Sequence, residues 1–187
     1  MKALLLTCAV LAIAAGPGKV FHSKEQALEL AFGKKSKVTR TTQYWTEEER
    51  DRLIELAGTK DVGLTHVAYA ELFEKGQADD GRRVWFDTRL VRTKQQTVML
   101  LVDKAGTVEK LVVCSFDEPL DYKPVDRWYA QFEGKKLDDQ LKLKKAIHGV
   151  SGATMTARST TAAVREMLAA DAVLRAPAPE PEPKPQR

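Results

Sequence analysis

Between positions 64 and 116 the chain alternates apolar and polar residues with a two-residue period, and this feature constrains its fold most. The pattern begins with Val67, Tyr69, Glu71 and Phe73, and continues with Val84, Phe86, Thr88 and Leu90 opposite Trp85, Asp87, Arg89 and Val91. The stretch 97–102 is nearly all apolar, and a turn at 103–106 leads into an apolar segment at 108–116. Consecutive strands joined by short turns predict an antiparallel sheet.

Helical patterns lie on both sides of this region. Ser23 with Gln26, and Thr46 with Glu49, form capping-box patterns ahead of two apolar-periodic segments that end at glycines 33 and 58. A third helical pattern starts near position 154 and runs to about 170. The predicted class is therefore α+β, an antiparallel sheet flanked by N-terminal helices and a C-terminal helix.

The C-terminal helix is preceded by Ser151-Gly152-Ala153-Thr154. Glycine lets the backbone approach a ligand closely, and the first turn of a helix has unpaired N–H groups and a positive partial charge. These properties favour a bound phosphate. Small hydroxyl residues ahead of a helix also serve as ordinary N-caps, so the tetrapeptide alone allows both interpretations.

The longer segment Ser-Gly-Ala-Thr-Met-Thr at 151–156, followed by Val164-Arg165, resembles the flavinylation motif of the FMN-binding domain family. This family includes the flavin-carrying subunits of the sodium-pumping NADH:quinone oxidoreductase and many small exported proteins. Five further segments resemble the small exported members, at 86–88, 91–93, 116–119, 128–132 and 137–139. The resemblance covers residues 20–174 and identifies them as one FMN-binding domain.

The resemblance implies that Thr154 carries FMN through a phosphoester bond made by a flavin transferase. Ser151, Gly152 and Ala153 complete the recognition motif, and Thr156 belongs to the same segment. Two positions depart from the family's pattern, because His148 stands where an acidic residue is usual and Ala157 where a serine or threonine is common. Non-covalent FMN, or a fold without flavin, therefore stays open.

Two further groups of residues, one aromatic and one basic, allow either a structural role or a role in cofactor binding. Trp128, Tyr129 and Phe132 are predicted to lie on a short helix, where aromatic residues form either core or an apolar lining for the flavin. Trp128 and Tyr129 are thus candidate cofactor-binding residues. Five lysines at 135, 136, 142, 144 and 145 form either a solvated loop or a positive field that favours a phosphate and a reduced, anionic flavin.

The ends of the chain differ in composition from the domain. Residues 1–15 resemble a signal peptide, with Lys2 followed by an apolar run that is too short to span a bilayer. Residues 175–187 are rich in proline, which predicts an extended, disordered tail. Without the signal segment Cys114 is the single cysteine, so no intrachain disulfide is expected and a buried core position is predicted for it.

Charge and motifs give no support to several other function classes. The net charge of +4 comes from 30 basic and 26 acidic residues mixed along the chain, which gives no reason to expect a nucleic-acid partner. The three histidines lack the spacing of a metal site, and no Gly-x-Gly-x-x-Gly or Walker loop is present.

The sequence therefore predicts an exported, periplasmic or otherwise extracytoplasmic FMN protein that carries electrons between partner proteins of the envelope or membrane. Association of the protein itself with the membrane stays open. Catalytic residues and a metal are not expected. Two alternatives stay open. One is a small flavin-dependent reductase with its own soluble substrate, and the other is a non-redox envelope protein that keeps the fold without flavin.

Overall fold

The computed structural model describes residues 18–34, 37–59, 65–72 and 80–176. The strands are β1 (Lys19–Val20), β2 (Lys37–Tyr44), β3 (Thr65–Leu72), β4 (Arg83–Leu90), β5 (Gln95–Val102) and β6 (Val108–Phe116). The helices are α1 (Lys24–Phe32), α2 (Glu47–Ala57), α3 (Asp126–Tyr129) and α4 (Thr154–Arg175), with 3-10 turns η1 (Leu120–Tyr122) and η2 (Ala130–Phe132). The signal and tail predictions fall mostly outside the described residues.

The six strands form one antiparallel sheet in the order β1-β6-β5-β4-β3-β2. The predicted α+β class with an antiparallel sheet is confirmed. The two edge strands, β1 and β2, were not predicted. β1 has only two residues, and β2 is mostly exposed and polar, so neither carries the apolar alternation that marks a half-buried strand.

The centre of the sheet is buried on both faces, which explains the nearly continuous apolar run in β5. Val98, Leu100 and Val102 face the larger core, whereas Met99 and Leu101 face a smaller one on the other side. Because side chains of a strand alternate between the two faces, a strand with helices on both sides needs apolar residues at every position.

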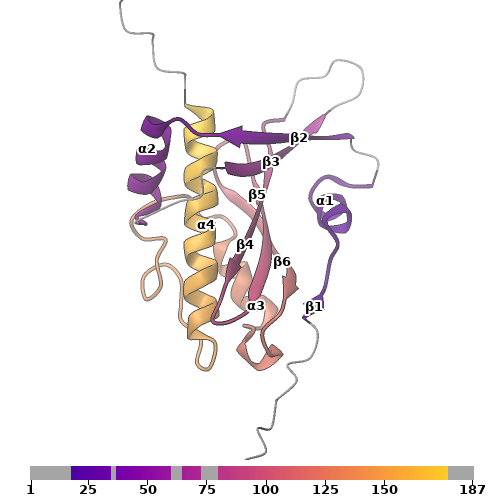
Figure 1. Ribbon diagram of the computed structural model, residues 1–187, viewed down its shortest axis with the longest axis vertical. Helices are drawn as coiled ribbons and strands as arrows, with labels where there is room; N and C mark the ends of the chain where they lie inside the picture. Colours follow the sequence, from indigo (N-terminus) through magenta and orange to yellow (C-terminus); the bar gives the residue numbers. More distant parts are fainter. Residues whose placement is uncertain (1–17, 35–36, 60–64, 73–79, 177–187) are drawn as a thin grey trace, which may run out of the picture.

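Helices cover the two faces. α4 runs along one face and packs against α2, while α1 lies on the opposite side of the sheet (Figure 1). Both predicted capping boxes are formed, at Ser23–Gln26 and Thr46–Glu49. α4 continues five residues beyond the predicted end, since Val173 on its last turn is also buried in the larger core.

The side chain of Arg165 in α4 binds backbone carbonyls of the surrounding segments. Arg165 is 7% exposed. Its guanidinium donates to the carbonyls of Leu56 and Ala57 at the end of α2, and to those of Asp138 and Leu141 in the loop before α4. The motif-bearing helix is thereby tied to α2 and to the 138–141 loop.

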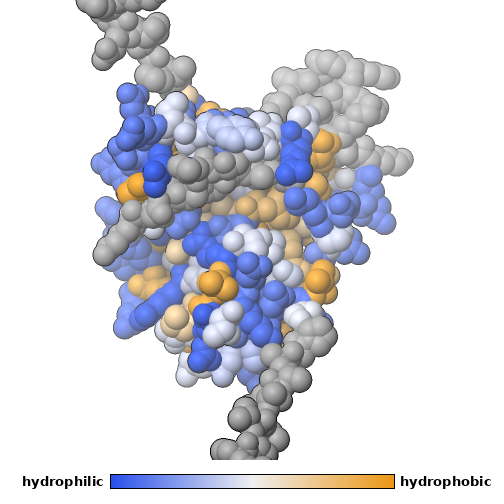
Figure 2. All heavy atoms as spheres, viewed as in Figure 1, coloured by the Kyte–Doolittle hydropathy of each residue, from blue (hydrophilic) through white to orange (hydrophobic). Residues whose placement is uncertain are grey.

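Hydrophilic residues cover much of the face seen in Figure 2, and apolar residues show there as a band across the middle and as smaller patches below. None of the helices in the described ranges has the length and apolar character needed to cross a membrane.

Candidate functional site

The first turn of α4 has no capping side chain. Ala153 occupies the N-cap position, and its carbonyl accepts the first intrahelical bond from the Ala157 N–H at 2.9 Å. The N–H groups of residues 154–156 therefore have no intrahelical acceptor, and the first turn has no acidic residue. This end of a 22-residue helix carries the positive partial charge that an anion requires.

Gly152 gives the chain its direction into this helix. Its φ is +80°, a conformation that L residues with a side chain rarely adopt. A Cβ at this position would meet no atom within 4 Å, so the requirement for glycine comes from the backbone angle and not from lack of space. The open space on this side leaves the helix end accessible to a ligand.

A pocket of about 210 Å³ lies at this helix end. It is lined by Gly152, Ala153, Thr154, Met155 and Thr156 of the motif segment, together with Arg92 and Tyr122. Of these motif residues, Thr154 and Met155 are exposed, and Ala153 and Thr156 are buried. Thr154 is thus an exposed residue of the pocket lining, and its hydroxyl has no hydrogen-bond partner among the described residues.

Arg92 reaches the pocket because a buried carboxylate shapes its turn. The β4–β5 turn places three successive N–H groups, of Arg92, Thr93 and Lys94, on one oxygen of Glu118 at 3.2, 2.7 and 2.9 Å. Burial opposes the charge of Glu118, but the hydrogen bonds from Thr93, Lys94 and Arg92 outweigh it, so its pKa lies below the ordinary value. The turn is thus held by an ionised group.

Tyr122 joins the turn to the helix. The Arg92 guanidinium carbon lies 4.7 Å from the centroid of the Tyr122 ring, a cation–π distance. The carbonyl of Tyr122 accepts a hydrogen bond from the Thr156 hydroxyl at 2.5 Å. Thr156 is buried, so its hydroxyl fixes the wall of the pocket instead of facing its opening.

The arrangement suits a phosphate ester better than a simple cap. Unpaired N–H groups, the absence of acidic residues in the first turn and the Arg92 guanidinium all favour negative charge at the Thr154 hydroxyl. A pocket of this size has room for a phosphate and a short polar chain but not for a ring as large as an isoalloxazine. Met155, which is 47% exposed, and Tyr122 offer apolar surface in the lining of the pocket.

The structure separates the remaining predicted residues from this pocket. Trp128 and Tyr129 are buried in the larger core, with their rings 5.1 Å apart, and Tyr129 lines a different pocket. The Trp128 indole donates to the carbonyl of His148 at 2.7 Å. Ser151 is exposed next to Gly152 without lining the pocket. A cofactor contact by Trp128 or Tyr129 remains a prediction, and the core interpretation fits their burial.

His148 is held through its backbone. Its N–H donates to the Gln131 side chain at 2.8 Å, its carbonyl accepts the Trp128 indole N–H, and its own side chain is exposed. Position 148 therefore displays its side chain at the surface, close in sequence to the motif but outside the pocket.

The lysine cluster also lies outside this pocket. Lys142 pairs with the Asp139 carboxylate at 3.5 Å, and the Lys145 ammonium donates to the Asp139 carbonyl at 3.1 Å. The positive side chain that does line the pocket, Arg92, was not singled out from the sequence. Segment 91–93 was part of the resemblance to the FMN-binding domain family, but that resemblance assigned no role to the arginine.

Two further predictions concern cysteine and metal. Cys114 is buried as expected, and burial raises the pKa of its thiol to about 11, so it stays protonated at neutral pH. Within the described part of the chain, no three histidine, cysteine, aspartate or glutamate side chains gather closely enough to hold a metal ion.

Comparison with known proteins bears on the cofactor of the chain. No curated protein and no solved structure matches the chain. Residues 93–169, however, match the family model of the FMN-binding domain. The matched segment begins directly after Arg92 and contains Glu118, Tyr122 and the whole 151–156 motif. The match supports a flavin-binding protein whose cofactor is FMN.

Proposed function

We propose that this protein is an electron carrier with FMN joined through its phosphate to the Thr154 hydroxyl. The observation that carries the proposal is the exposed residue Thr154, whose hydroxyl makes no hydrogen bond in the described structure, at an uncapped helix N-terminus in a pocket that Arg92 also lines. The FMN-binding domain match supports the cofactor. Bound flavin supplies one- and two-electron redox chemistry, and the protein supplies its position and electrostatic surroundings.

The residues of the pocket have separate roles in this proposal. The N–H groups of the first turn and Arg92 hold the phosphodiester, whose single negative charge the helix dipole also stabilises. Tyr122 and Met155 provide the surface on which the ring rests. Arg92 in addition raises the local positive potential, which favours a reduced, anionic flavin over the oxidised form.

Attachment requires an activated flavin, and a flavin dinucleotide bound by a flavin transferase has the necessary phosphoanhydride. The Thr154 oxygen forms a bond to the FMN phosphorus, the phosphoanhydride bond breaks, AMP leaves, and the hydroxyl proton passes to the transferase or to water. Because the hydroxyl makes no hydrogen bond within the described structure and is exposed, the transferase reaches it without unfolding the helix.

The pocket favours a carrier over a reductase with its own substrate. A reductase needs a proton donor beside the flavin and a second cavity for the substrate. The residues that line this pocket are an arginine, a tyrosine, a methionine, two threonines and two small residues, with no carboxylate or histidine. Electron exchange with a partner protein requires only an accessible flavin edge, which the open mouth permits.

The exposed side chain of His148 does not obstruct the pocket. If the transferase recognises an acidic side chain at this surface position, His148 lowers the rate of FMN attachment without affecting the FMN once it is attached. The proposal also includes export of the protein by its 1–15 segment and electron exchange with redox partners in the membrane or envelope. It further includes a relation to the flavin-carrying subunits of the sodium-pumping oxidoreductase.

The intact mass of the denatured protein, co-expressed with a flavin transferase, tests the attachment. The wild-type protein should gain the mass of one FMN minus water. Thr154→Val, which removes the hydroxyl at similar volume, should gain nothing, whereas Thr154→Ser should keep the increment. His148→Asp should raise the labelled fraction if the transferase reads this position.

Three other outcomes have distinct meanings. A yellow native protein that loses its flavin on denaturation indicates non-covalent FMN. A colourless protein under all conditions refutes the electron-carrier proposal and favours the non-redox alternative. Rapid, saturable turnover of a small oxidant by the flavinylated protein favours the reductase alternative.

A further inference from the structure

A second pocket of about 210 Å³ lies beside the 120–123 segment. Tyr122 lines the motif pocket, and the next residue, Lys123, lines the second one. One wall comes from β6, and Phe21 and His22 of the N-terminal arm, residues 18–22, line the side next to it. The N–H groups of Phe21 and His22 both donate to the carbonyl of Cys114, at 2.8 and 3.1 Å, which seats the arm on β6.

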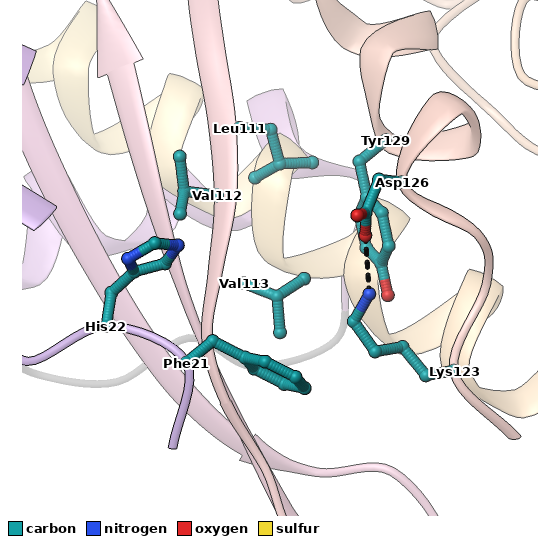
Figure 3. A pocket seen from close by; sticks show the side chains of 8 residues that line it. All are labelled: Phe21, His22, Leu111, Val112, Val113, Lys123, Asp126 and Tyr129. Carbon is teal, nitrogen blue, oxygen red and sulfur yellow. Dashed lines mark hydrogen bonds and ion pairs between the residues drawn. The ribbon is translucent and has the colours of Figure 1, made fainter. Parts of the chain in front are cut away.

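The walls of this pocket are mostly apolar on the β6 side, where His22 is a polar lining residue, and polar on the other side. Figure 3 shows Leu111 and Val113 of β6 facing Tyr129 and Lys123 across the pocket, with the Phe21 ring beside them. The Tyr129 hydroxyl and the Lys123 ammonium lie on the same side (Figure 3). A ligand with an apolar body and one polar end matches such walls.

The Tyr129 hydroxyl is buried without a hydrogen-bond partner in the described structure. The residue is only 4% exposed, and its phenolic oxygen finds neither a donor nor an acceptor. Burial, and secondarily the charge of Asp126, raise the pKa of Tyr129 well above its ordinary value, so the hydroxyl remains a donor at any physiological pH. Buried polar groups are rarely left unpaired, and this one needs an acceptor that the chain does not provide.

Lys123 adds positive charge at the same end. Its ammonium lies 5.3 Å from the centroid of the Phe21 ring and 5.2 Å from that of Tyr129, and it pairs with Asp126 at 2.7 Å. The Lys123 side chain is 14% exposed, whereas that of Asp126 is 94% exposed. Asp126 also lines the pocket, but because it is so exposed, water screens its carboxylate far more than it screens the ammonium.

We propose that this pocket binds a small monocarboxylate with an aromatic or branched apolar body. The carboxylate oxygens accept hydrogen bonds from Lys123 and Tyr129 after a small displacement of the lysine side chain, and the apolar body packs on Phe21, Leu111 and Val113. The volume lies below the roughly 300 Å³ at which sites for drug-sized ligands begin, which restricts the ligand to a molecule about as large as benzoate.

Isothermal titration calorimetry of the full chain with sodium benzoate tests the proposal. Protein expressed without a flavin transferase is suitable, because the pocket shares no residue with the motif pocket. We expect saturable binding at one site. Tyr129→Phe, which removes only the hydroxyl, and Lys123→Met, which keeps the apolar stem, should each weaken binding by about tenfold or more, as expected for a hydrogen bond to a charged group.

The controls separate this site from general effects. Lys110→Met removes an exposed lysine that directly precedes Leu111 on β6, and it should leave the affinity for benzoate unchanged. Benzyl alcohol, which lacks the charge, should bind more weakly than benzoate to the wild-type protein. Circular dichroism should show that Tyr129→Phe remains folded, since it removes an unpaired buried group.

Two results would overturn the proposal. One is the absence of saturable benzoate binding at millimolar concentrations, and the other is binding that survives both Tyr129→Phe and Lys123→Met unchanged. Thr154→Val should bind benzoate like the wild type, so failure of this site and failure of flavin attachment are distinguishable.

Discussion

Glu118→Gln tests whether the ionised carboxylate of Glu118 holds the turn that presents Arg92. The substitution keeps the size of the side chain and one acceptor oxygen but removes the charge. Thr93 and Lys94 donate to that oxygen at 2.7 and 2.9 Å, with a longer bond from Arg92. A hydrogen bond to a charged group contributes about 1 kcal/mol more than a neutral one, so the two short bonds predict a loss of about 2 kcal/mol at pH 7.

The predicted loss depends on pH in a defined direction. The pKa of Glu118 is lowered in the folded protein from an ordinary value of 4.5. The ionised group therefore stabilises the fold fully above its unfolded pKa, and this contribution is lost as the pH falls through the lower folded pKa. The wild-type protein and Glu118→Gln should differ most near neutral pH and converge in strong acid.

Urea denaturation followed by tryptophan fluorescence at several pH values between 7 and 3 measures this difference. A loss of about 2 kcal/mol corresponds to a decrease in Tm of about 4–8 °C for a domain of this size. Glu109→Gln is the matched control, because Glu109 is exposed on β6 and should change the free energy of unfolding by less than about 0.5 kcal/mol. An equal difference at pH 3 and pH 7 would refute the reasoning, since it would mean that the charge does not matter.

Three further substitutions test contacts described above. Arg165→Met leaves four buried or half-buried backbone carbonyls without a donor, so urea denaturation should show a free energy of unfolding lower by about 2–4 kcal/mol. Arg165→Lys should not restore the stability, because lysine lacks the planar guanidinium that reaches several carbonyls at once. Thr160→Val removes the 3.0 Å partner of the fully buried Gln96 amide and should cost about 1–3 kcal/mol, which Gln96→Leu in the same protein should largely restore. In the flavinylated protein, Arg92→Met should lower the midpoint potential of the flavin by about 20–30 mV, because about 1 kcal/mol of charge stabilisation of the reduced flavin is lost. A spectroelectrochemical titration measures this potential, and an unchanged value would contradict the role of Arg92.

The local sequence determined the elements whose signals lie within a few neighbouring residues. The strand pattern at 97–102 and both capping boxes depend on side chains three or fewer positions apart, and the structure forms them as predicted. The motif at 151–154 lies at the start of a helix for the same reason, because helix initiation is decided by the first turn. The resemblance then gave the cofactor class, which the match at 93–169 supports.

The tertiary structure decided which distant residues meet at that helix. Arg92, Glu118 and Tyr122 stand more than thirty positions before Thr154, and neither periodicity nor spacing relates them to it. They converge because β5 and β6 return the chain to the same end of the sheet, where the Thr156 hydroxyl bonds to the Tyr122 carbonyl. Trp128 and Tyr129 are nearer to the motif in sequence, yet packing directs them into the core. Contacts between segments far apart in the chain depend on how the whole sheet packs, and a single sequence carries no local signal for them.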